Sequence, residues 1–176
     1  MALCLKILAK CYPMKQAALI FNILLIALLF ASCATTQNAR AYRKAIHGTW
    51  QLETIVSEGV TSKLNSQLFN EAQFDCFIGS NWQFNNNNSL GTYSILSNAN
   101  ECAAVKRNLR WSVYEATDQP KLLQFKRLDE KLNEIDANSG GFRFIITHLD
   151  KTRMSVRSDL SFEGKPAAII YNFKKT

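Results

Sequence analysis

The chain has 176 residues, 47% of them hydrophobic and 20% charged, and a formal net charge of +7 at pH 7. Its Lys and Arg residues are scattered rather than gathered into a stripe, which excludes a typical nucleic-acid-binding surface. We therefore expect no nucleic-acid partner, and the length indicates one folded domain behind a leader.

The first predicted element is a secretion signal. Residues 17–31 are apolar except for Asn22 and follow Lys15, whereas a membrane-spanning helix needs roughly 20 apolar residues. A shorter apolar segment after a positive charge is typical of a signal-peptide helix. Because Met14 stands directly before Lys15, we expect translation to start at Met14 and residues 1–13 to lie outside the protein.

The apolar segment ends in Ala31-Ser32-Cys33, which resembles the lipobox of bacterial lipoproteins. The resemblance implies that residues 1–32 are removed and that Cys33 carries lipid, which would attach the protein to a membrane. Two alternatives remain open: an ordinary signal peptide with a cysteine nearby, or an uncleaved N-terminal anchor. No acidic cluster follows Cys33, so the expected location is the periplasmic side of a bacterial outer membrane.

The next segment is predicted to be a tether. Residues 34–45 are polar and show no strand periodicity, so we expect residues 33–45 to form a flexible lipidated linker. The folded domain would then span residues 46–176.

The domain begins with a strand. Trp50, Leu52, Thr54 and Val56 occupy alternate positions, which is the period of a strand with one buried face. We therefore expect these four side chains to share a face.

More short strands follow, separated by turn residues. The asparagine run 85–88 favours a tight hairpin with a left-handed backbone between strands at 81–84 and 91–95. Further strands are expected at residues 108–116, 121–128, 141–149, 153–162 and 166–173. Eight strands in succession predict an all-β, antiparallel up-and-down barrel, because closing the sheet removes its exposed edges.

One connection, residues 57–79, is much longer than the others. Ser62 can cap a helix in which Leu64 and Leu68 lie four residues apart, so we expect a short helix there. A long loop at a barrel mouth serves as a lid or as a plug held by Cys76, and the sequence leaves both open.

The cysteines predict one disulfide. Cys4 and Cys11 lie in the leader and Cys33 would carry lipid, which leaves Cys76 and Cys102. An exported protein meets an oxidising compartment, so we expect this pair to be bridged. The alternative is two buried thiols.

The first strand opens with His47-Gly48-Thr49-Trp50-Gln51-Leu52, which resembles the Gly-x-Trp signature of the lipocalins. Residues 74–84, 108–111 and 162–166 are similar to lipocalin-like lipoproteins of Bacteroidetes. The resemblance covers residues 46–176 and implies an eight-stranded lipocalin-like barrel.

In that family the signature is structural, so the resemblance implies that Gly48 lets the backbone enter the barrel and that Trp50 closes its bottom. A basic side chain from near the end of the chain usually covers the Trp. Lys174 and Arg157 are both candidates for this cation–π contact.

The resemblance also implies binding of a small apolar ligand, since eight strands enclose room for one. The expected lining consists of aromatic residues on the strands, namely Trp82, Phe84, Tyr93, Trp111, Phe144 and Tyr171. So many rings could instead fill the barrel, leaving a structural lipoprotein that contacts another envelope protein. An interior cavity of roughly 300 Å³ or more would separate the two hypotheses.

The sequence offers little for catalysis. His47 and His148 are the only histidines, and neither has the spacing of a metal or catalytic motif. Arg157 and Asp159 share a strand face and are expected to form a structural ion pair, while Asp129, Glu130 and Glu134 are expected in a solvated turn. We expect no enzymatic activity, no metal and no cofactor.

Overall fold

The computed structural model describes residues 37–60, 67–96, 102–116, 118–135 and 140–176. The predicted signal peptide, the start at Met14, the lipidated Cys33 and the first residues of the tether lie outside these ranges. Within the described ranges, no helix combines the length and apolar character needed to cross a bilayer.

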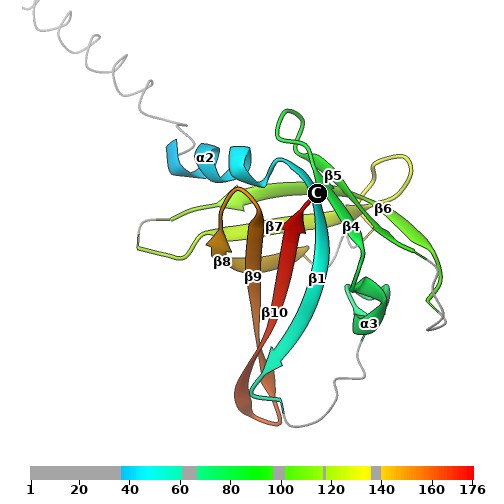
Figure 1. Ribbon diagram of the computed structural model, residues 1–176, viewed down its shortest axis with the longest axis vertical. Coiled ribbons are helices and arrows are strands. Elements are labelled where there is room, and N and C mark those ends of the chain that lie inside the picture. Colours follow the sequence, from blue (N-terminus) through cyan, green and yellow to red (C-terminus); the bar gives the residue numbers. More distant parts are fainter. Residues whose placement is uncertain (1–36, 61–66, 97–101, 117, 136–139) are drawn as a thin grey trace, which may run out of the picture. The chain divides into compact units, whose positions relative to one another are not determined.

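Eight antiparallel strands close into a barrel in the order β1-β10-β9-β8-β7-β6-β5-β4 (Figure 1). The strands are β1 (Gly48–Glu58), β4 (Asn81–Phe84), β5 (Leu90–Ile95), β6 (Val105–Tyr114), β7 (Leu122–Leu128), β8 (Phe142–Leu149), β9 (Arg153–Phe162) and β10 (Lys165–Lys175). Each strand pairs with its neighbours in sequence, except that β1 closes the barrel against both β4 and β10. The predicted up-and-down barrel is confirmed.

Strand β1 does not keep one face for all four residues of its predicted pattern. Trp50 and Leu52 are buried, but Thr54 and Val56 are exposed. The pairing with β10 shifts between Leu52 and Thr54, as a β-bulge does when it adds one residue to a strand. The shift turns Ile55 toward the core in place of its neighbours, so the simple alternation is wrong beyond Leu52.

The β4–β5 hairpin forms where the sequence predicted it, but its asparagines act through their side chains. Asn85 Oδ1 accepts from Asn87 N at 2.9 Å and Asn88 Oδ1 accepts from Leu90 N at 3.0 Å. The left-handed residue of this turn is Ser89, with φ 60°. The asparagine run therefore stabilises the turn mainly as a series of side-chain caps.

The prediction of a flexible tether is wrong from Gln37 onward, because Gln37–Ile46 form helix α2. Ala39 and Ile46 are buried, at 3% and 0% exposure, and Tyr42 packs against the core. Their spacing of three to four residues gives the helix an apolar stripe, and burying that stripe supplies the stability that a polar linker lacks. Helix α2 therefore belongs to the folded unit, which extends to the N-terminal side of residue 46.

Arg43 ties α2 to the β4–β5 hairpin. Its guanidinium donates to Asn86 O at 2.9 Å and to Ser89 Oγ at 2.8 Å, and lies 5.2 Å from the centre of the Trp111 ring. Trp111 Nε1 in turn donates to Leu90 O at 3.1 Å. Arg43 was expected to lie in a solvated linker. Through these contacts it instead holds the helix against the barrel.

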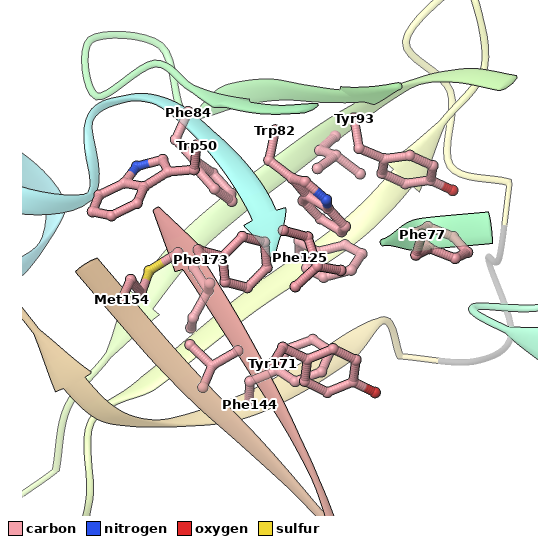
Figure 2. Packing of buried hydrophobic residues seen from close by; sticks show 14 of the residues in the cluster. Trp50, Phe77, Trp82, Phe84, Tyr93, Phe125, Phe144, Met154, Tyr171 and Phe173 are labelled. Carbon is pink, nitrogen blue, oxygen red and sulfur yellow. The ribbon is translucent and has the colours of Figure 1, made fainter. Parts of the chain in front are cut away.

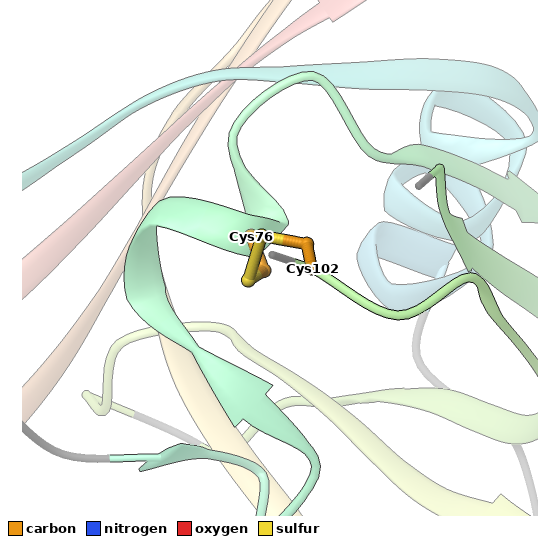
Figure 3. The surroundings of a disulfide bond; sticks show 2 residues. All are labelled: Cys76 and Cys102. Carbon is orange, nitrogen blue, oxygen red and sulfur yellow. A yellow bond between two sulfur atoms is a disulfide. The ribbon is translucent and has the colours of Figure 1, made fainter. Parts of the chain in front are cut away.

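The long connection between β1 and β4 holds a small hairpin and a short helix. Strands β2 (Gln67–Leu68) and β3 (Ala72–Gln73) pair, and helix α3 (Phe74–Phe77) follows. The loop therefore contains a short helix, but not the one predicted: Leu68 belongs to a strand, and Ser62 and Leu64 lie outside the described ranges. The expected disulfide joins Cys76 of α3 to Cys102, with Sγ atoms 2.07 Å apart (Figure 3).

Trp50 is fully buried, and Lys175, rather than Lys174 or Arg157, covers it. Lys175 Nζ lies 5.0 Å from the ring centre and donates to Ala45 O at 3.2 Å. Strand register explains the choice, because Trp50 stands directly opposite Lys175 in the β1–β10 pair. Gly48 has φ 122°, and a Cβ there would lie 3.0 Å from Lys175 Cε, so a larger residue would disturb this contact.

Candidate ligand site in the barrel interior

Aromatic side chains fill the inside of the barrel. In Figure 2, rings from β4, β5, β7, β8 and β10 point toward one another. All six residues predicted to line a lumen are buried, with exposures of 5% or less: Trp82, Phe84, Tyr93, Trp111, Phe144 and Tyr171. Inward-facing positions follow from the alternation of each strand, which is why the sequence could identify them.

The space left between these rings is about 10 Å³. That is about the room needed for a single water molecule. It is lined by Phe69, Trp82, Phe84, Leu123, Phe125, Phe144, Val156, Tyr171 and Phe173. The criterion of an interior cavity of roughly 300 Å³, which separates an open ligand-binding barrel from a filled one, is therefore not met.

The structure brings four of the six predicted residues to this space and leaves two elsewhere. Trp111 packs against Phe84, with ring centres 5.2 Å apart, and under Arg43. Tyr93 instead donates its hydroxyl to Glu71 at 2.7 Å. The interior is thus divided between an apolar centre and a polar end.

Two buried rings come from the long connection rather than from the barrel wall: Phe77 of α3 and Phe69. Phe69 lies on the turn between β2 and β3, yet it is only 7% exposed. Its ring centre lies 4.9 to 6.4 Å from those of seven other aromatic residues: Phe77, Trp82, Tyr93, Phe125, Phe142, Phe144 and Tyr171. The long loop is therefore a plug, one of the two forms that the sequence left open.

The turn that carries Phe69 holds a strained backbone. Phe69 and Asn70 have φ values of 56° and 52°, and Glu71 N donates to Leu68 O at 3.0 Å. Two successive left-handed residues are typical of a type I′ turn, whose usual residues are Asn, Asp and Gly. A bulky aromatic residue in this conformation is uncommon, because its Cβ crowds the backbone. Burial of the Phe69 ring offsets this strain.

Glu71, at the end of the same turn, is held by three side chains of the barrel wall. Arg107 donates through Nε to Oε2 at 2.8 Å and through Nη2 to Oε1 at 2.6 Å. Arg127 Nη1 donates to Oε2 at 2.9 Å, as does the Tyr93 hydroxyl at 2.7 Å. The arrangement is a two-pronged arginine–carboxylate pair reinforced by two further donors.

These contacts change the titration of the groups involved. The hydrogen bonds from Arg107 lower the pKa of Glu71 to about 2, against the opposing effect of burial. Burial, together with the hydrogen bond to Glu71, raises the pKa of Tyr93. The carboxylate is consequently charged, and the phenol neutral, over the physiological range.

Sequence reasoning missed Phe69 and Glu71. Phe69 was expected at the end of a helix, and the three partners of Glu71 lie on separate strands, 22 to 56 positions away in the sequence. Only the long loop with a cysteine in it signalled that something could enter the barrel. No local pattern marks Glu71.

A larger hollow of about 410 Å³ lies on the outer face of β6 and β7. Its lining includes the outward-facing residues Arg110, Ser112, Gln124 and Lys126. This hollow is separate from the apolar space between the interior rings.

The remaining sequence candidates lie at the surface. Arg157 Nε donates to Asp159 Oδ1 at 2.6 Å, the expected ion pair. His148 Nε2 lies 2.9 Å from Asp150 Oδ2 in an exposed turn. Asp129 Oδ1 accepts from Asn133 N at 2.8 Å, again in a solvated turn.

Comparison with solved structures finds distant likenesses. A lipocalin-like protein from Bacteroides uniformis ATCC 8492 is 15% identical, with a TM-score of 0.41, and the alignment covers 75% of this chain and 99% of that one. A bovine odorant-binding protein in complex with its natural ligand is 14% identical, with a TM-score of 0.40, covering 82% of this chain and 77% of that one. A search of curated proteins finds no match.

The family model described as a lipocalin-like domain matches residues 46–156, which run from the last residue of α2 into β9. The match includes the Gly48–Trp50 signature, the plug turn and the disulfide. The chain therefore belongs to the lipocalin-like domain family.

Proposed function

We propose that this protein is a non-enzymatic lipoprotein, anchored to the outer membrane through Cys33, that takes a small apolar molecule into its barrel in place of Phe69. The observation that carries the proposal is the plug itself. Phe69 is an aromatic group supplied by a loop, surrounded by seven rings of which six belong to barrel strands or their ends. An apolar ligand that entered after the turn withdrew would meet the same rings.

Three features favour withdrawal of the turn over rearrangement of the wall. The wall rings lie on strands of a closed barrel, where both edges of every strand are hydrogen-bonded. The Phe69 turn belongs to a separate two-stranded sheet of two residues per strand, and so small a hairpin has little stability of its own. Its left-handed backbone at Phe69 and Asn70 would relax on leaving the barrel.

The anchor in this proposal rests on the sequence. The short apolar segment and the Ala31-Ser32-Cys33 ending would place lipid on Cys33 after removal of residues 1–32. The domain would then stand near the membrane surface, where apolar molecules concentrate.

The proposal is tested with a neutral fluorescent probe, N-phenyl-1-naphthylamine, and the whole chain carrying Cys33→Ser, which we expect to be released from membranes. Phe69→Ala should bind the probe about tenfold more tightly than the parent protein or better, because the ring no longer competes for the space. Leu132→Ala is the matched control. Leu132 also has a left-handed backbone, with φ 65°, but its side chain is 41% exposed.

A second function has its own support, because the residual space of about 10 Å³ leaves the barrel essentially solid. In that case the protein is a structural or interaction lipoprotein that contacts another envelope protein. Failure of both the parent and Phe69→Ala to bind the probe would favour this second function. The anchor is tested separately: Cys33→Ser should abolish labelling with radioactive palmitate, and unchanged labelling would exclude Cys33 as the acceptor.

A further inference from the structure

The polar end of the interior is built around one carboxylate. Glu71 is 8% exposed in its side chain and Arg127 is 6% exposed in its own, so this ion pair is withdrawn from solvent. Arg107 completes the cluster as a second guanidinium on the same carboxylate. Both guanidinium groups therefore contact the same carboxylate.

The donors and the acceptor belong to different parts of the fold. Tyr93, Arg107 and Arg127 lie on β5, β6 and β7, three adjacent strands of the barrel wall, and Tyr93 stands directly opposite Arg107 in the strand register. Glu71 comes from the plug turn. If the turn withdraws, the wall keeps both guanidinium groups and the hydroxyl, and the carboxylate leaves with the plug.

The plug turn places two chemically different groups next to each other. Phe69 puts an aromatic ring among the apolar side chains of the interior, and Glu71, two residues later, puts a carboxylate between the arginines. Both groups are recognised by wall residues, and the peptide between them forms the turn. The groups that the turn presents to the wall, one aromatic ring and one carboxylate, are those of an apolar molecule with a carboxylate at its end.

We infer that the ligand is a monocarboxylate with an apolar chain or ring, which displaces the Phe69–Glu71 turn and takes the place of Glu71 between Arg107, Arg127 and Tyr93. This inference rests on the proposed function and names the class of molecule bound. A neutral ligand that displaced the turn would remove the Glu71 carboxylate from Arg107 and Arg127 and supply no anion in its place. Removing one partner of the buried Glu71–Arg127 ion pair is costly. A carboxylate ligand restores those contacts, so the wall discriminates in its favour.

The test compares dodecanoate with dodecanol, which share an apolar chain and differ in the head group, by equilibrium dialysis against the whole chain carrying Cys33→Ser. We expect dodecanoate to bind about tenfold more tightly than dodecanol or better. Arg107→Gln should reduce this preference by about tenfold. Asp159→Asn, which removes the carboxylate of an exposed arginine pair on the outside of the barrel, should leave the preference unchanged.

The plug carboxylate supplies a second measurement. Glu71→Gln should weaken the plug's hold on the arginines, so dodecanoate should bind more tightly than to the parent, by about tenfold, and should raise the melting temperature of this variant more than dodecanol does. If Glu71→Gln fails to fold, the comparison of dodecanoate with dodecanol on the parent protein still tests whether the site prefers a carboxylate.

The outcomes separate the two proposals. Equal binding of dodecanoate and dodecanol would overturn the carboxylate inference and leave the apolar site in place. Absence of binding by both probes, and by N-phenyl-1-naphthylamine to Phe69→Ala, would overturn the proposed function itself. A preference that survives Arg107→Gln unchanged would also overturn the inference, since the head group would then be recognised elsewhere.

Discussion

Replacement of Phe69 by alanine tests whether the plug is an integral part of the core. The ring is 7% exposed and packs against seven other rings, and deletion of such a side chain from a protein core costs about 3–5 kcal/mol. Phe69 lies on a short hairpin rather than on the barrel wall, so the turn can shift into part of the vacated space. We therefore expect the free energy of unfolding to fall by about 3 kcal/mol, near the lower end of this range.

Urea unfolding followed by tryptophan fluorescence, with the disulfide intact, measures this loss. With a slope of about 2 kcal/mol/M, the unfolding midpoint should fall by about 1.5 M. Leu132→Ala is the control, because Leu132 shares the left-handed backbone while its side chain is 41% exposed. Its free energy of unfolding should stay within about 0.5 kcal/mol of the parent.

A loss below about 1 kcal/mol in Phe69→Ala, with an unchanged slope, would contradict the reasoning. It would mean that the ring contributes little to the folded state and that the turn is not seated in the barrel in solution. A different result would be that Phe69→Ala loses about 3 kcal/mol of unfolding free energy and that N-phenyl-1-naphthylamine does not restore it. That result would show that the plug has a structural role only.

Three further predictions concern other parts of the molecule. Breaking the Cys76–Cys102 disulfide by replacing both residues with Ser should lower the free energy of unfolding by about 3.5 kcal/mol in urea, from the 26-residue separation and the entropy of loop closure; a loss under about 1 kcal/mol would contradict the chain-entropy estimate. Because the pKa of Glu71 falls from 4.5 to about 2 on folding, its stabilisation is complete above about pH 4.5 and is lost as the pH falls toward 2, by about 3 kcal/mol in all. Unfolding measured between pH 7 and 2.5 should show this decline in the parent and much less of it in Glu71→Gln, so equal declines would exclude Glu71 as the source. Lys175→Met should cost about 1 kcal/mol through loss of the contact with Trp50, whereas Lys174→Met should cost nothing measurable, and the reverse order would contradict the observed register.

The elements that could be predicted from the sequence depend on neighbours along the chain. Alternation and turn residues identified the eight barrel strands, because each strand shows its buried face in its own sequence. The Cys76–Cys102 bridge could be predicted by counting cysteines, given the expectation that the chain is exported. Helix α2 could have been predicted as well, since Ala39, Tyr42 and Ile46 show a helical spacing that the polar composition of the segment obscured.

Other features depend on pairing between distant segments. The bulge after Leu52 and the choice of Lys175 to cover Trp50 follow from the register of β1 against β10, across more than a hundred residues. A register shift of one residue reverses the face of every following side chain, and the sequence of one strand does not contain that shift.

The sequence by itself determined a closed antiparallel barrel of the lipocalin-like type, with aromatic residues facing inward and one disulfide. Only the tertiary structure decided what occupies the barrel, because Phe69 and Glu71 act on residues that lie far away in the chain. The physical reason is that periodicity reports which side of a strand is buried, whereas the occupant of the interior is set by packing volume and by the pairing of charges in three dimensions. The barrel wall could thus be predicted from the sequence, and the turn that fills the barrel could not.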